Sequence, residues 1–185
     1  MLRVIAGTAR GRRLKGPAGR VTRPTAERVR EALFNIIEVA GKSFLDVFAG
    51  SGAVGIEALS RGAGQVTFIE KHPRALKALQ ENLASTGLGD RAEVMAMDVF
   101  RALPKLTSAG RRFDFIFMDP PYEQGLVAKV LPWVVRLLTG EGCIIVETAS
   151  REVAPVVEGV TLKDSRRYGD AVLHFYQKNM GVGQG

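Results

Sequence analysis

The sequence of 185 residues contains one cysteine, two histidines and no run of about 18 consecutive apolar residues. A single cysteine excludes an internal disulfide, so we expect a protein of a reducing, cytoplasmic compartment. The lack of a long apolar run predicts no membrane span, and the first seven residues show no apolar core of a signal peptide. Because Cys143 lies in the apolar run Gly142-Cys143-Ile144-Ile145-Val146, we expect a packed thiol and not a nucleophile.

Acidic residues are scarce in the first 30 positions, and this scarcity is local. These positions hold nine basic residues and one acid, a net charge of +8, whereas the other 155 residues carry a net charge of −1 within a total of +7. A positive segment beside a nearly neutral remainder is typical of proteins that bind a polyanion. A solvated basic tail is the alternative. The charge pattern therefore favours a nucleic acid as the partner.

The order of predicted elements indicates one α/β domain, and 46% apolar residues suffice for its core. Residues 2–6 and 12–15 can pair as a small hairpin, and Thr25 is predicted to cap a helix that ends at Gly41. Strands are then predicted at 44–48, 66–69, 92–96, 113–118, 142–147, 160–166 and 171–177, and helices at 54–61, 73–85 and 126–138. This alternation predicts a mostly parallel, seven-stranded sheet with helices on both faces and an antiparallel last strand.

Four successive strand ends carry an acidic residue. These residues are Asp46, Glu70, Asp98 and Asp119, each within the end of an apolar run or just beyond it. In open α/β sheets, ligands bind in the crevice beyond the carboxyl ends of the strands. Four acids along that one edge therefore predict a ligand site, which a pattern that serves only solubility would not produce.

The turn after the first strand is rich in glycine. The segment Asp46-Val47-Phe48-Ala49-Gly50-Ser51-Gly52 leads into a helix, and residues 50–55 match the dinucleotide fingerprint G-x-G-x-x-G. Glycines allow a sharp turn and a close approach of the backbone to a ligand. Glu70, about twenty residues later, can accept hydrogen bonds from ribose hydroxyls. A dinucleotide and another nucleoside cofactor both fit this pattern, and a turn without a ligand is the alternative.

The segment Asp119-Pro120-Pro121-Tyr122 distinguishes these cofactors. Its prolines fix the backbone, so we expect the Asp119 carboxylate and the Pro120 carbonyl to point at one spot, beside an aromatic ring on which a base can stack. An exocyclic base amine is a poor nucleophile because its lone pair is delocalised into the ring. Two acceptors that hold its N–H groups favour a tetrahedral nitrogen aimed at a methyl donor. Asp98 can accept from an adenine amine, and a rigid turn after the strand is the alternative interpretation.

Together these residues resemble a known class of enzymes. Residues 46–52, Glu70, Asp98 and residues 119–122 resemble the class I S-adenosylmethionine-dependent methyltransferases, whose fold is Rossmann-like, and the Asp-Pro-Pro-Tyr corner is that of amino-group methylators. Residues 3–7, 10–14, 23–25, 28–35 and 48–62 are more selective, and they resemble the bacterial 16S rRNA (guanine-N2)-methyltransferase family. The likeness leaves out only the last few residues, 181–185.

The resemblance implies a cytoplasmic, monomeric enzyme with S-adenosylmethionine as cofactor, S-adenosylhomocysteine as product and no metal. Its substrate would be one guanine of 16S rRNA in the 30S subunit or an assembly intermediate, held by the catalytic residues Asp119, Pro120 and Tyr122. The implied cofactor-binding residues are Asp46, Phe48, Gly50, Ser51, Gly52, Glu70, Lys71, Asp98, Val99 and Asp119. The implied RNA-binding residues, which would grip phosphates, are Arg10, Arg12, Arg13, Arg23 and Arg28. Phe48 stands where the cofactor turn often has its first glycine, as in the amino-methylator branch.

We therefore expect a basic hairpin arm at residues 1–24, a methyltransferase domain at 25–180 and a flexible tail at 181–185. Three alternatives stay open: a DNA amino-methyltransferase, a protein glutamine methyltransferase, and a noncatalytic RNA-binding or assembly module. Against them stand the short chain, which has no room for a DNA-reading domain, the Asp that precedes the prolines where protein methylators usually carry Asn, and the complete set of pocket acids. His72 is expected at the rim of the adenine pocket or in solvent, and His174 in a structural role.

Overall fold

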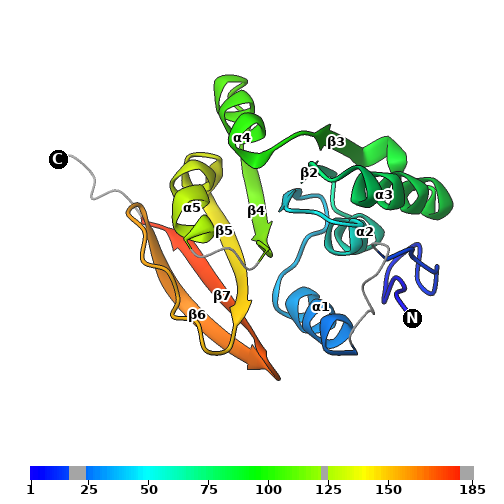
Figure 1. Ribbon diagram of the computed structural model, residues 1–185, viewed down its shortest axis with the longest axis horizontal. Coiled ribbons are helices and arrows are strands. Elements are labelled where there is room, and N and C mark those ends of the chain that lie inside the picture. The colour runs from blue at the N-terminus through cyan, green and yellow to red at the C-terminus, as the bar shows by residue number, and fades with distance from the viewer. Residues whose placement is uncertain (17–23, 122–124, 180–185) are drawn as a thin grey trace.

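The computed structural model describes residues 1–16, 24–121 and 125–179. Its centre is one seven-stranded sheet in the order β3-β2-β1-β4-β5-β7-β6 (Figure 1). The strands are β1 (Ser43–Val47), β2 (Gln65–Glu70), β3 (Ala92–Ala96), β4 (Phe113–Met118), β5 (Leu138–Ala149), β6 (Val160–Tyr168) and β7 (Ala171–Lys178). The helices are α1 (Pro24–Ile36), α2 (Ala53–Ser60), α3 (Pro73–Thr86), α4 (Val99–Ser108) and α5 (Leu126–Arg136), with a short 3-10 turn at Gly89–Arg91.

The strand directions confirm the expected mixed sheet. All neighbouring pairs among β3, β2, β1, β4 and β5 are parallel, and β7 runs antiparallel to both β5 and β6. The chain builds outward from β1 to β3 on one side and then returns to place β4 on the other side of β1. The point between β1 and β4 is therefore the topological switch of the sheet, where ligands of open α/β folds bind.

Helices cover both faces of the sheet, and two apolar cores result. One core joins the sheet to α1, α2 and α3 through residues such as Leu33, Phe44 and Leu79. The other joins it to α4 and α5 through residues such as Leu45 and Leu131. Adjacent residues of β1 thus enter opposite cores, as the alternation of side chains along a strand requires. None of the helices within the described residues is long and apolar enough to span a membrane.

The first 16 residues pack onto α2 and α3, beside α1 in Figure 1. An antiparallel bridge joins Arg3 to Arg13. This bridge pairs the two segments that were predicted to form a small hairpin. The side chains of Val4 and Leu14 are buried in the core. The buried carboxylate of Glu57 in α2 accepts hydrogen bonds from the backbone N–H groups of Ile5 (2.8 Å) and Ala6 (3.0 Å). The segment is thus tied to the helix that follows the glycine turn.

Three local expectations differ from the structure. Helix α1 begins at Pro24, so Thr25 lies inside the helix and is not its cap, and it ends at Ile36, before Gly41. Proline suits the first turn of a helix, where its missing N–H would be unpaired in any case. Helix α4, which was not predicted, contains Pro104 in its interior.

Cys143 is half-buried, and burial raises the pKa of its thiol to about 11, which agrees with an unreactive, packed side chain.

Candidate active site

The glycine turn after β1 uses a backbone conformation that most residues avoid. Phe48, Gly50 and Gly52 have φ values of 64°, 60° and 82°, and Phe48 is the one non-glycine residue with positive φ among those described. A Cβ atom at Gly52 would lie 2.2 Å from a side-chain carbon of Leu79, whereas one at Gly50 would meet no atom within 4 Å. Gly52 is therefore required by packing, and the backbone at Gly50 faces open space that a ligand can enter.

The carboxylate of Glu70 fixes this turn against the end of β2. It accepts hydrogen bonds from the backbone N–H groups of Gly50, Lys71 and His72, each at 2.8 Å. An ionised carboxylate offers about four lone-pair directions, so about one direction is left for a ligand hydroxyl. The side chain that the sequence predicted to bind ribose is thus rigidly held beside the glycine turn.

Asp46 lies beneath the turn in the core of the protein. Its carboxylate is 2% exposed and accepts a hydrogen bond of 3.0 Å from the N–H of Gly55 in α2. Burial raises the pKa of Asp46 to about 7, and the negative charges of Asp119 and Glu70 add to the rise. The charge coupling joins the ends of β1, β2 and β4 in one electrostatic cluster, as expected from the four strand-end acids.

Asp98 and Lys71 lie farther along the same edge of the sheet. Asp98 caps α4 by accepting from the Phe100 N–H at 2.9 Å, and that bond lowers the pKa of its carboxyl group. The Lys71 ammonium lies 3.2 Å from the same carboxylate. Val99, the first residue of α4, is buried. Two predicted cofactor residues are therefore an ion pair, which joins the end of β2 to the start of α4.

Asp119 follows β4 directly and is solvent-exposed, and Pro120 next to it is half-buried. In the parallel register, Met118 pairs with Val47 on β1 and with Val146 on β5. Asp119 therefore stands at the level of Phe48 on one side and of Glu147 on the other. Tyr122 and Arg23 lie outside the described residues, so the structure does not place these two predicted site residues.

Glu147 is a residue of this edge that the sequence analysis passed over. It is half-buried in β5, and burial raises the pKa of its carboxyl group to about 8, with the charge of Asp119 as the second cause. A signal was present in the sequence, because Glu147 ends an apolar strand in the same way as the four acids that were singled out. The carboxyl edge thus holds acidic side chains from five neighbouring strands.

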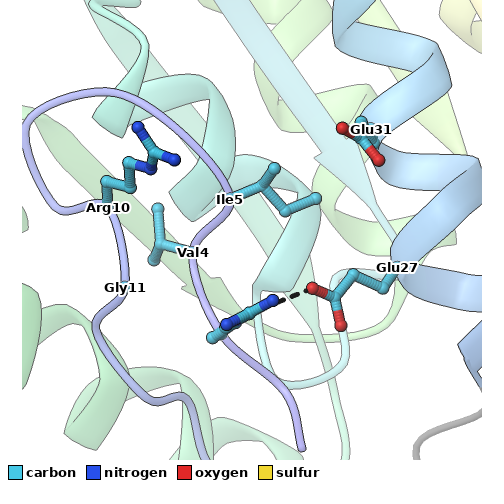
Figure 2. Close-up of a pocket in the computed structure, with 7 residues that line it drawn as sticks. Val4, Ile5, Arg10, Gly11, Glu27 and Glu31 are labelled. Atoms are coloured by element: carbon cyan, nitrogen blue, oxygen red, sulfur yellow. Dashed lines mark hydrogen bonds and ion pairs between the residues drawn. The ribbon is translucent and has the colours of Figure 1, made fainter.

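The predicted RNA-binding arginines lie on the surface. Arg10, Arg12, Arg13 and Arg28 are exposed, and none of them forms an ion pair within the described ranges. Figure 2 shows a pocket between the N-terminal segment and α1, lined by arginines and by Glu27 and Glu31. Arg3 forms an ion pair with Glu27 there, at 3.2 Å. The pocket is therefore not a purely basic anion site, and the unpaired arginines around it are the residues available to a polyanion.

Comparison with known proteins confirms the resemblance seen in the sequence. The model of the family described as conserved hypothetical protein 95 matches residues 2–177. The chain belongs to this family. Its relative from Escherichia coli K12, named "Ribosomal RNA small subunit methyltransferase D", is 34% identical over 182 residues, covering 96% of this chain and 90% of the relative. The protein YlbH of Bacillus subtilis is 35% identical over 182 residues, covering 96% of this chain and 99% of that one.

A solved structure of a similar protein shares the fold. A hypothetical protein of Thermus thermophilus superposes with a TM-score of 0.82 at 36% identity, covering 96% of this chain and 99% of the other. The fold, including its seven strands, is thus shared over nearly the whole chain.

Proposed function

We propose that this protein transfers a methyl group from S-adenosylmethionine to the N2 amine of one guanine in 16S rRNA. The observation that carries the proposal is the convergence of the glycine turn, Glu70 and Asp119-Pro120 at the switch point between β1 and β4. The Escherichia coli relative, named a ribosomal RNA small subunit methyltransferase, supports an rRNA substrate. The guanine and its N2 atom rest on the resemblance of the N-terminal motifs.

The residues along the carboxyl edge suit S-adenosylmethionine. Open space over Gly50 leaves room for the methionine part, and the remaining acceptor capacity of Glu70, which holds the Gly50 N–H, would take a ribose hydroxyl. Asp98 and the backbone of Val99, at the start of α4, would accept from and donate to an adenine ring. When bound, this cofactor supplies an electrophilic methyl group on a sulfonium cation.

Asp119 and Pro120 would bind and orient the target base. The exposed Asp119 carboxylate and the Pro120 carbonyl would accept hydrogen bonds from the two N–H groups of the amine and so turn its lone pair toward the methyl group. Such positioning can be worth roughly 7–11 kcal/mol of the barrier. The amine loses one proton after it gains the methyl group, and Asp119 is the nearest of these groups to accept that proton. Tyr122 would stack on the base.

The arginines of the N-terminal segment would supply the RNA grip. Arg10, Arg12, Arg13 and Arg28 are exposed, and together with Arg23 they would contact phosphates, which sets the affinity but not the sequence that is read. The backbone bonds from Ile5 and Ala6 to Glu57 tie the segment that carries Arg10, Arg12 and Arg13 to α2, the helix that follows the glycine turn.

The test is transfer of a labelled methyl group to 30S particles from a strain that lacks the enzyme. Nucleoside analysis of the RNA is expected to place the label in N2-methylguanosine at a single position. Duplex DNA and glutamine-bearing protein substrates serve as parallel acceptors and should take up no label. Label in another nucleoside, in DNA or in protein would overturn the assignment and leave one of the alternative amino-methyltransferase activities.

A further inference from the structure

Glu147 lies beside Asp119 on the edge where the base would bind. Met118 and Val146 are paired in the parallel register, so the next residue on each strand, Asp119 and Glu147, stand level. Neighbouring strands lie about 4.8 Å apart, which two side chains can span to reach one flat ring. The influence of the Asp119 charge on Glu147 agrees with this proximity.

The face of the sheet is also settled by the register. Phe117 and Ile145, two positions before Asp119 and Glu147, both enter the core beneath α1, α2 and α3. Side chains two apart on a strand share a face, so Glu147 projects toward the same side as Phe44 and Asp46. That is the side of the sheet on which α2 follows the glycine turn.

No hydrogen bond or ion pair within the described residues explains why an acidic side chain stands at position 147. Within the described residues, no group donates a hydrogen bond to it and no cation pairs with it, although it is half-buried. The next residue, Thr148, differs: its hydroxyl lies 2.9 Å from His174 Nε2, and the other ring nitrogen of His174 lies 2.8 Å from Ser165. That network joins β5, β7 and β6, and it satisfies the polar side chains that form it. The oxygens of the Glu147 carboxyl group are not fully buried, so a ligand at this edge can reach them.

The chemistry of guanine supplies a matching donor. On the Watson–Crick edge of guanine, the N1–H lies next to the N2 amine, and enzymes that act on an extruded base read that edge by hydrogen bonds. If Asp119 and Pro120 hold the amine, N1–H is the next donor along the edge, and it faces the neighbouring strand. A carboxyl group there can accept N1–H through one oxygen whether or not it is ionised.

We propose that Glu147 accepts the N1–H of the target guanine and thereby makes the site selective for guanine, an inference that rests on the proposed function. Burial raises the pKa of Glu147 and so favours its protonated form, whose hydroxyl can also donate to O6. The paired N1–H and O6 of guanine match such a group. A base that has no hydrogen on N1 and no O6 cannot donate to the Glu147 carboxyl oxygen, and it offers no O6 to accept from the Glu147 hydroxyl.

The test compares two bases in two enzymes. Once the target is located, 30S particles are reconstituted with guanine or with 2-aminopurine at that position, since 2-aminopurine keeps the amine but lacks N1–H and O6. The Glu147→Ala variant should lower kcat/KM for guanine about 10- to 100-fold, as expected for leaving a base edge unpaired. The penalty for 2-aminopurine should be at least about 10-fold in the natural enzyme and shrink to about threefold or less in this variant.

The Glu147→Gln variant and a distant acid complete the design. An amide accepts N1–H and donates to O6 as a protonated carboxyl group does, so Glu147→Gln should stay within about threefold of the natural enzyme on guanine. Glu141→Ala, an exposed position at the other end of β5, should change neither base preference nor rate. Equal penalties for 2-aminopurine in the natural enzyme and in Glu147→Ala would refute this inference alone. A natural enzyme that puts no methyl group on guanine N2 would refute the proposed function instead.

Discussion

The side chain of Asn82 in α3 donates a hydrogen bond of 2.9 Å to the carbonyl oxygen of Ser51 in the glycine turn. The same amide group donates to the carbonyl of Lys15 at 2.9 Å and accepts from the Lys15 N–H at 2.7 Å. Asn82 is 1% exposed, so water cannot replace these bonds. One buried amide thus holds both the glycine turn and the end of the basic segment.

Replacement of Asn82 by alanine should therefore affect both parts. We expect the free energy of unfolding to fall by about 2–4 kcal/mol, because three backbone groups lose a buried partner, and the affinity for S-adenosylmethionine to fall with it. Urea denaturation and calorimetric titration measure the two effects. The exposed neighbour Gln80 is the control, and Gln80→Ala should alter neither. An Asn82→Ala variant as stable as the natural protein would disprove the bridging role.

Asp119→Ala separates binding from transfer. The variant should bind S-adenosylmethionine within about threefold of the natural affinity, yet lose about 100- to 1000-fold in transfer rate, because the base amine loses an acceptor aimed at it. Calorimetry and single-turnover labelling provide the two values. Asp90→Ala, at an exposed acid in the 3-10 turn before the amino end of β3, is the matched control. Parallel loss of binding and transfer would assign Asp119 to the cofactor.

Asp46 should make stability depend on pH. Its pKa rises from an ordinary 3.8 to about 7 on folding, so the folded state holds a proton that the unfolded chain releases. Stability is therefore greatest below about pH 4 with respect to this group and is lost as the pH rises to about 7. The Asp46→Asn variant, which keeps an acceptor for Gly55, should gain stability relative to the natural protein over that range, by about 4 kcal/mol at most.

The pH experiment consists of denaturant unfolding of both proteins at intervals from pH 4 to 8. The difference between the two free energies removes the contributions of all groups that they share. A difference that stays constant across the range would show that Asp46 titrates near its ordinary pKa.

The basic segment predicts a salt effect. Neutralising Arg10, Arg12 and Arg13 together should weaken RNA binding and reduce the slope of log affinity against log salt by about 2, since each phosphate contact contributes about 0.7 to 0.9. Filter binding at several salt concentrations gives the slope. The control removes three exposed charges on the other side of the sheet, Lys105, Arg112 and Arg136, and should leave the slope unchanged. An equal slope in both triple variants would exclude a phosphate contact by the N-terminal arginines.

The sequence predicted those parts of the fold that depend on local pattern. The strands at Ala92–Ala96 and Phe113–Met118 agree at both ends with the prediction, because each is a short apolar run with a clear boundary. Helix α4 was not predicted from the sequence, although Val99, Leu103 and Leu106 recur at helical spacing. Pro104 obscured that pattern, because proline in a helix interior normally argues against a helix.

The site was predictable from the sequence where it depends on local motifs and on the order of the strands. The glycine turn and its strand-end acids were visible, since topology brings successive strand ends to one edge. The hydrogen bonds of Asn82 and those from the N-terminal segment to Glu57 were not, because they join residues more than 30 positions apart and depend on packing that no short motif encodes. Glu147 shares the strand-end signal of the other acids, but its place beside Asp119 becomes visible only in the register of the paired strands.

The docking of residues 1–16 has a practical consequence for anyone who handles this protein. Val4 and Leu14 are part of the core, so a truncation that trims this segment would cut into the interior and not merely remove a charged leader. Met1 is 72% exposed beside the exposed arginines. A purification tag fused to the amino terminus would therefore crowd the surface that is expected to contact RNA.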